Sequence, residues 1–239
     1  MATKKSQRIA IWVIAITLTV GTLGGFLVMV LAPKNQAVDQ ARLDQLISEY
    51  REEYDVYQKK VNTRDEKIAN ELTKKYYGEY KKYQSRATKF DAKSVKKLEK
   101  IDLKKGTGAE IKGDTAFAAY YMLWLPNGKI KEQSASDGKL GFPLDISDGL
   151  DKASLISGWK EGLLGMKIGG VRELTLPSDK GYGSEDKKDA EGKVDIPANT
   201  PLKFVVMAVP APDKGEEIAE PPMSNELKRL YAQINKVQL

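Results

Sequence analysis

A run of 24 uncharged residues near the N-terminus, from Ile9 to Ala32, is the strongest constraint on how this chain can fold. As an α-helix it would be about 36 Å long, enough to cross the roughly 30 Å hydrocarbon core of a bilayer. Three basic residues precede it, which favours a cytoplasmic N-terminus with the rest of the chain outside the cytoplasm. The length favours a retained anchor over a cleavable signal peptide, whose apolar core is only about 7–15 residues long. The sequence therefore predicts a single-pass membrane protein, with a cytoplasmic tip and transmembrane anchor over 1–34 and contact with the lipid bilayer through residues 9–32.

The next segment has the pattern of a long charged helix. Residues 36–85 contain no proline and a single glycine, and seven of the eleven tyrosines lie there. Apolar and aromatic side chains recur at alternating spacings of four and three residues up to Val61 and, after a break at Arg64–Asp65, resume from Ile68, a helical periodicity with a coiled-coil-like seam. We expect a charged, Tyr-rich helical stalk over 35–94. Three roles are open for it: a homodimer formed through the seam, an arm that holds client chains, or a solvated spacer. The seam residues are Leu43, Ile47, Tyr50, Tyr54, Tyr57, Val61, Ile68, Leu72, Tyr76, Tyr80 and Tyr83.

The chain contains neither histidine nor cysteine. This composition excludes a disulfide framework, a Cys/His metal site, a cysteine nucleophile and a Ser-His-Asp triad. We expect no metal and no cofactor, and any catalysis must proceed without a side chain that titrates near neutral pH on its own. The formal net charge is +6, yet residues 106–239 hold 17 basic and 20 acidic side chains. Because the basic excess lies outside that half, we expect no nucleic-acid partner.

After Lys100 the pattern changes from helical to strand-like. Short runs rich in Val, Ile, Tyr and Phe alternate with Gly, Pro, Asn and Asp. One short helix is predicted over residues 157–166, and we expect an α+β fold in which antiparallel strands have one helix covering a face. Residues 213–239 are expected to form a linker and a C-terminal amphipathic helix. The predicted strands cover residues 99–104, 115–125, 142–146, 171–176 and 202–209.

Four motifs follow one another in this C-terminal half. They are Gly158-Trp159-x-x-Gly162-Leu163-x-x-Met166, Arg172-x-Leu-x-Leu-Pro177, Gly181-Tyr182-Gly183 and Ile196-Pro197-x-Asn199. In this order and spacing, residues 95–212 resemble the FKBP family of peptidyl-prolyl cis-trans isomerases. The resemblance implies an FKBP-like fold, a twisted antiparallel β-sheet wrapped around one short helix.

The resemblance also implies an activity. A peptidyl-prolyl cis-trans isomerase accelerates rotation about X–Pro bonds, and here it would assist the folding of exported proteins. Its partners would be proline-containing polypeptides that are unfolded or partly folded. Burying the proline in an apolar aromatic pocket favours the twisted amide, which has lost resonance and polarity. The alternative is a non-catalytic proline-peptide or client-binding chaperone or tether with a degenerate form of the same pocket.

The resemblance assigns ten residues to this site. Trp159 would be the pocket floor, and the Ile156 N–H and the Tyr182 hydroxyl would hydrogen-bond the carbonyls of the bound peptide. Lys131 and Glu132 stand where the family usually has Phe and Asp, so Lys131 would bring water to one wall and reduce activity. The apolar walls would be Tyr121, Phe142, Leu155, Ile156, Ile196 and Phe204.

Overall fold

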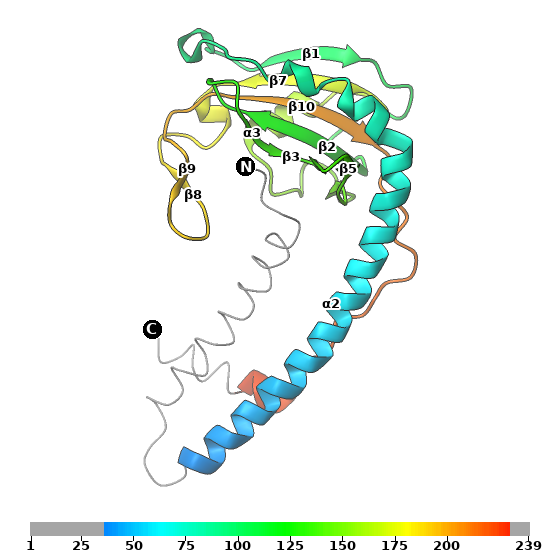
Figure 1. Ribbon diagram of the computed structural model, residues 1–239, viewed down its shortest axis with the longest axis vertical. Helices are drawn as coiled ribbons and strands as arrows, with labels where there is room; N and C mark the ends of the chain where they lie inside the picture. Colours follow the sequence, from blue (N-terminus) through cyan, green and yellow to red (C-terminus); the bar gives the residue numbers. More distant parts are fainter. Residues whose placement is uncertain (1–35, 230–239) are drawn as a thin grey trace. The chain divides into compact units, whose positions relative to one another are not determined.

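The computed structural model describes residues 36–229 of the chain (Figure 1). These residues belong to two compact units, one formed by 36–64 with 215–229 and the other by 65–214.

A six-stranded antiparallel sheet is the centre of the unit 65–214. Its strands follow the order β1-β7-β10-β2-β3, and the short strand β6 also pairs with β2. The predicted antiparallel sheet with a short helix is confirmed, the helix being α3 (Ser157–Leu163). The strands of this sheet are β1 (Glu99–Lys104), β2 (Phe117–Trp124), β3 (Ile130–Gln133), β6 (Leu144–Ile146), β7 (Val171–Leu176) and β10 (Leu202–Val209). Two small ladders join β4 (Ala135–Ser136) to β5 (Lys139–Leu140) and β8 (Lys187–Lys188) to β9 (Val194–Ile196); the short 3-10 helices are η1 (Gln84–Arg86), η2 (Ala92–Ser94) and η3 (Ser178–Lys180).

Both faces of the central strands are covered, which explains why β2 and β10 are almost continuous apolar runs. Along β2, Phe117, Ala119 and Leu123 belong to a core cluster that includes residues of α3. The alternate residues, Tyr120 and Met122 among them, belong to a second cluster. Because successive side chains of a strand point to opposite faces, the sheet has a separate core on each side.

The long helix α2 (Gln36–Lys81) supplies the cover for the second face. Its residue Tyr80 is only 2% exposed, and the Thr73 hydroxyl hydrogen-bonds both the N–H and the carbonyl of Leu140, at 3.0 and 3.2 Å. Residues of the predicted seam, Leu72 and Tyr76 with Tyr80, therefore pack on the sheet of the same chain. A stalk separate from the folded domain and a coiled coil are not supported, because a tyrosine stripe can pack on a sheet as well as on a second helix.

In the unit 36–64 with 215–229, the first turns of α2 pack against the C-terminal segment. Leu43, Leu46 and Leu227 are buried together, and Arg42 forms an ion pair with Glu226 at 3.1 Å. Residues 225–229 are helical, and the Ser224 hydroxyl accepts the Leu227 N–H at 3.1 Å as an N-cap. The first part of the predicted seam thus also packs against another segment of the same chain.

No helix of residues 36–229 is long and apolar enough to cross a membrane. On this finding, the transmembrane helix in the predicted fold class and the predicted single-pass location with an extracytoplasmic domain are wrong. The long helix α2 carries charged side chains along its whole length, and these are costly to place in hydrocarbon. The run from Ile9 to Ala32, on which both predictions depended, lies outside the described residues.

Candidate functional site

Helix α3, which carries Trp159, approaches strand β7 closely because two of its residues are glycines. A Cβ on Gly158 would lie 2.7 Å from a Leu176 methyl carbon, and one on Gly162 would lie 2.8 Å from both methyl carbons of Leu174. Residues four apart share one face of a helix, so both glycines face the strand. The spacing Gly-x-x-x-Gly therefore allows a helix–strand distance that any larger side chain would increase.

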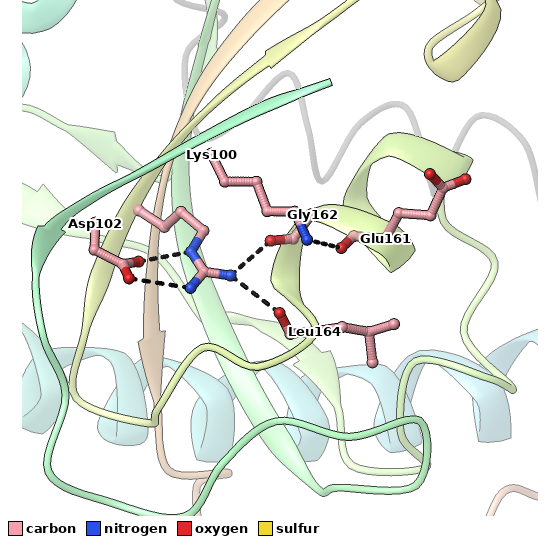
Figure 2. A network of polar contacts seen from close by, with 6 residues as sticks. Lys100, Asp102, Glu161, Gly162 and Leu164 are labelled. Atoms are coloured by element: carbon pink, nitrogen blue, oxygen red, sulfur yellow. Dashed lines mark hydrogen bonds and ion pairs between the residues drawn. The ribbon is translucent and has the colours of Figure 1, made fainter. Parts of the chain in front are cut away.

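Two cations fix the C-terminal end of α3 (Figure 2). Arg172 of β7 is 6% exposed and donates from Nη1 to the carbonyls of Gly162 at 2.8 Å and Leu164 at 3.2 Å. Lys100 of β1 donates to the carbonyl of Glu161 at 2.8 Å. Carbonyls at the end of a helix lack intrahelical partners and carry partial negative charge, so cations there stabilise the helix.

The Arg172 guanidinium is itself held by Asp102 of β1. Its Nε and Nη2 donate to the two carboxylate oxygens of Asp102 at 2.7 and 3.2 Å, a bidentate geometry. These hydrogen bonds from Arg172 lower the pKa of Asp102 below its ordinary value. One network thus joins β1, β7 and the helix that carries Trp159 (Figure 2).

Three aromatic rings meet at Trp159. The Tyr121 ring of β2 lies 5.3 Å from the indole with an interplanar angle of 87°, and the Phe204 ring of β10 lies 5.5 Å away at 86°. Edge-to-face contacts of this kind are favourable beyond the area that they bury. Trp159 and Phe204 are each 3% exposed, and Ile196 of β9 is buried in the same cluster. The sheet and α3 therefore form an aromatic cluster centred on the indole.

Leu155 and Ile156 precede α3 and pack against this cluster. The Ile156 carbonyl accepts the N–H of Trp159 at 3.0 Å. Its own N–H donates to no protein acceptor in the part of the chain that the structure describes, so this donor is available to a ligand. Phe142 is half-buried outside the cluster, with the Lys214 ammonium 6.0 Å from its ring centroid.

The two residues that depart from the family pattern are both engaged. The Tyr121 hydroxyl donates to a carboxylate oxygen of Glu132 at 2.5 Å. The Lys131 ammonium forms an ion pair with Asp195 of β9. This ion pair joins Lys131 of β3 to the β8–β9 ladder at the edge of the site.

The hydroxyl of Tyr182 also has a charged neighbour. The ammonium of Lys187 on β8 donates to it at 3.2 Å and lies 4.5 Å from the centroid of its ring. An ammonium at this distance from a phenol ring is a cation–π contact. The β8–β9 ladder thus reaches two positions of the site, Tyr182 and Lys131.

The structure brings seven of the ten predicted residues into one core cluster. Glu132 joins them through its hydrogen bond with Tyr121, whereas Lys131 and Phe142 lie at the edge. Sequence reasoning did not identify Lys187 and Asp195, because their approach to Tyr182 and Lys131 depends on how the charged β8–β9 segment folds. The seven are Tyr121, Leu155, Ile156, Trp159, Tyr182, Ile196 and Phe204.

Similarity to known proteins defines the class. The model of the FKBP-type peptidyl-prolyl cis-trans isomerase family matches residues 106–209. The FK506-binding protein of Neisseria meningitidis serogroup B is 42% identical over 83 residues, which are 35% of this chain and 72% of that protein. This chain belongs to the FKBP-type peptidyl-prolyl cis-trans isomerase family.

Other relatives share only this region. The FK506-binding protein 4 of Chaetomium thermophilum is 37% identical over 103 residues, which are 43% of this chain but 19% of that protein. Among solved structures, a peptidyl-prolyl cis-trans isomerase from Pseudomonas syringae pv. tomato is 31% identical with a TM-score of 0.39, covering 48% of this chain and 76% of that one. The chain therefore spans about a fifth of the fungal relative.

Proposed function

We propose that this protein is a peptidyl-prolyl cis-trans isomerase that assists the folding of proline-containing polypeptides. The observation that supports this most is the cluster of perpendicular rings, Tyr121 and Phe204 edge-on to Trp159. The cluster is apolar, and the groups around it donate hydrogen bonds. In this proposal a proline ring packs against the apolar cluster, and peptide carbonyl groups accept from the Ile156 N–H and the Tyr182 hydroxyl.

Such a set of groups suits the reaction. Rotation about an X–Pro bond has a barrier of about 18–20 kcal/mol from amide resonance and takes tens to hundreds of seconds uncatalysed. At the top of the barrier the amide is twisted and less polar, so an apolar site binds it better than it binds the planar amide. Fixed donors orient the carbonyl without proton transfer. A chain without histidine and cysteine can do this chemistry.

In this proposal Trp159 lies under the proline ring. The Ile156 N–H and the Tyr182 hydroxyl bind peptide carbonyls on either side of it. Apolar contacts with the substrate come from Tyr121, Phe142, Leu155, Ile156, Ile196 and Phe204. Glu132 orients Tyr121 through the hydrogen bond between them.

The second candidate is a protein that binds proline peptides without catalysis. The charge of Lys131 beside the site favours it, because water that accompanies a charge weakens the burial of proline. Both an isomerase and a binder bind the peptide, but only an isomerase accelerates its cis–trans exchange. We therefore measure two quantities on the full chain with an Ala-Leu-Pro-Phe peptide: the affinity for the peptide, and the rate of its cis–trans exchange by NMR.

We expect the wild-type chain to bind the peptide and to accelerate exchange. Trp159→Ala removes the proposed floor, worth about 1.5–3 kcal/mol of apolar burial, so acceleration should fall by about tenfold to a hundredfold. Tyr57→Ala is the matched control, an aromatic truncation on α2 far from β2 and β10 in the sequence, and it should leave acceleration unchanged. Binding by the wild type without acceleration would establish the second candidate instead.

A further inference from the structure

The two tyrosines of the site have neighbours of opposite charge. Tyr121 donates to the carboxylate of Glu132, whereas Tyr182 accepts from the ammonium of Lys187. One phenol is therefore next to an anion and the other next to a cation. A peptide that contacted both phenols would therefore meet an anion beside one and a cation beside the other.

Lys187 differs from the other lysines near the site. Lys131 is paired with Asp195, and Lys214 is paired with Asp145. Within residues 36–229, no carboxylate lies within ion-pair distance of the Lys187 ammonium. Its contacts are the hydroxyl and the ring face of Tyr182.

Two acidic residues of the same loop, Asp186 and Asp189, accept hydrogen bonds from backbone N–H groups. The Asp186 carboxylate accepts the N–H of Ala198 at 2.8 Å. The Asp189 carboxylate accepts the N–H groups of Glu191 and Lys193 at 3.0 and 2.9 Å. These hydrogen bonds hold both carboxylates in the loop turns, so the Lys187 charge remains open to a carboxylate from outside the chain.

Two consequences follow from the position of this ammonium. Its hydrogen bond to the phenol oxygen polarises the Tyr182 O–H, which becomes a stronger donor because hydrogen bonds in a chain reinforce one another. A peptide whose carbonyl accepts from Tyr182 also brings its neighbouring side chains near the half-buried Lys187. An acidic side chain there gains a charge-assisted hydrogen bond, and a basic one is repelled.

We propose that Lys187 is a specificity-determining residue and that the site prefers X–Pro peptides with an Asp or Glu within two residues of the proline. This inference rests on the proposed isomerase function and names the substrate class for it. Glu132 is hydrogen-bonded to Tyr121, whereas the charged group that contacts the Tyr182 hydroxyl is Lys187.

The test uses the full chain and three matched proline peptides that carry Glu, Gln or Lys next to the proline. The quantity measured is kcat/KM for cis–trans exchange, compared between peptides for each protein variant. For the wild type we expect the Glu peptide to exceed the Gln peptide by about threefold, the size of a partly exposed ion pair, and the Lys peptide to be the poorest. Added salt should reduce the ratio, because it screens this interaction.

Substitutions assign the preference to one side chain. Lys187→Met should bring the Glu/Gln ratio to about one, Lys187→Arg should keep it, and Lys187→Glu should favour the Lys peptide. Lys188→Met is the matched control, since Lys188 is the exposed neighbour on β8 and should keep the wild-type ratio. Because each ratio is taken within one variant, a general loss of activity does not imitate the effect.

The outcomes separate the two proposals. Equal acceleration of all three peptides by the wild type, or a Glu preference that survives in Lys187→Met, overturns the role of Lys187 and leaves the isomerase proposal standing. No acceleration of any peptide overturns the isomerase proposal, and the substrate preference falls with it.

Discussion

The hydroxyl of Tyr80 on helix α2 donates a hydrogen bond to the backbone carbonyl of Tyr121 at 2.9 Å. The same carbonyl accepts the N–H of Ser134, and the Ser134 hydroxyl accepts the N–H of Tyr121, both at 2.8 Å. The backbone that carries one ring of the aromatic cluster is therefore fixed from the opposite face of the sheet. Burial raises the pKa of the Tyr80 hydroxyl, which keeps it a donor at physiological pH.

Tyr80→Phe tests this contact. It removes the hydroxyl but keeps the ring in its core cluster, and the Tyr121 carbonyl retains its bond from Ser134. We expect the free energy of unfolding in urea to fall by about 1 kcal/mol, the usual net worth of one such hydrogen bond. Tyr83→Phe is the control, because its hydroxyl bonds the side chain of Glu79, only four residues away in the chain, and should matter less. If the two substitutions lowered the free energy of unfolding equally, the hydrogen bond from Tyr80 to the Tyr121 carbonyl would have no special stabilising role.

The glycines of the chain give a second, paired prediction. Gly158→Ala places a methyl group 2.7 Å from Leu176 and should destabilise the protein by about 1–3 kcal/mol through overpacking. Gly78→Ala, on an open surface of α2, meets no atom within 4 Å and should stabilise it by about 1 kcal/mol. Thermal unfolding of both variants checks the opposite signs. A stabilising Gly158→Ala would show that α3 does not depend on this close approach.

Removing Arg172 from its network should lower the free energy of unfolding more than removing the Tyr80 hydroxyl. Arg172→Met leaves the Gly162 and Leu164 carbonyls without their donor, so we expect destabilisation of about 2–4 kcal/mol at neutral pH in urea unfolding. Arg172→Lys keeps the charge but not the bidentate fork, and it should lie between the wild type and Arg172→Met. A cost as small as that of a surface substitution, below about 0.5 kcal/mol, would exclude the proposed anchoring of α3.

The same network predicts a pH dependence. The folded pKa of Asp102 is lowered, so its contribution to stability is complete above its unfolded pKa of about 3.9 and is lost as the pH falls through the lower folded value. Because the Asp102 side chain is 39% exposed, we expect about 0.5–1 kcal/mol from this group. Unfolding in urea between about pH 5 and pH 2 should show Arg172→Met losing less stability than the wild type. If the free energies of unfolding of the two proteins fell in parallel with pH, the protonation of Asp102 would not be coupled to Arg172.

The strands that form the sheet centre could be predicted from the sequence. Runs 171–176 and 202–209 coincide with β7 and β10, because β10 is an almost continuous apolar run and β7 is a short run bounded by Gly170 and Pro177. Trp159 and Tyr182 could be singled out by their glycine-flanked motifs. The structure places both in the same core cluster.

Other features could not be predicted from the sequence. The tyrosine stripe of α2 has the same spacing whether it packs on a helix or on a sheet, so the contact of Tyr80 with β2 was not foreseen. Strands β8 and β9 have only two and three residues, too few to give a periodic signal. The approach of Lys187 to Tyr182 depends on that ladder and became visible only in the fold.

The most direct test of the proposed isomerase function is the cis–trans exchange rate of an X–Pro peptide in the presence of the full chain and of Trp159→Ala, measured by NMR with the peptide in molar excess. We expect the wild type to shorten an exchange that otherwise takes tens to hundreds of seconds, and Trp159→Ala to lose most of this acceleration. An exchange rate unchanged by the folded wild-type chain, or an acceleration that Trp159→Ala fully retains, would contradict the proposed function.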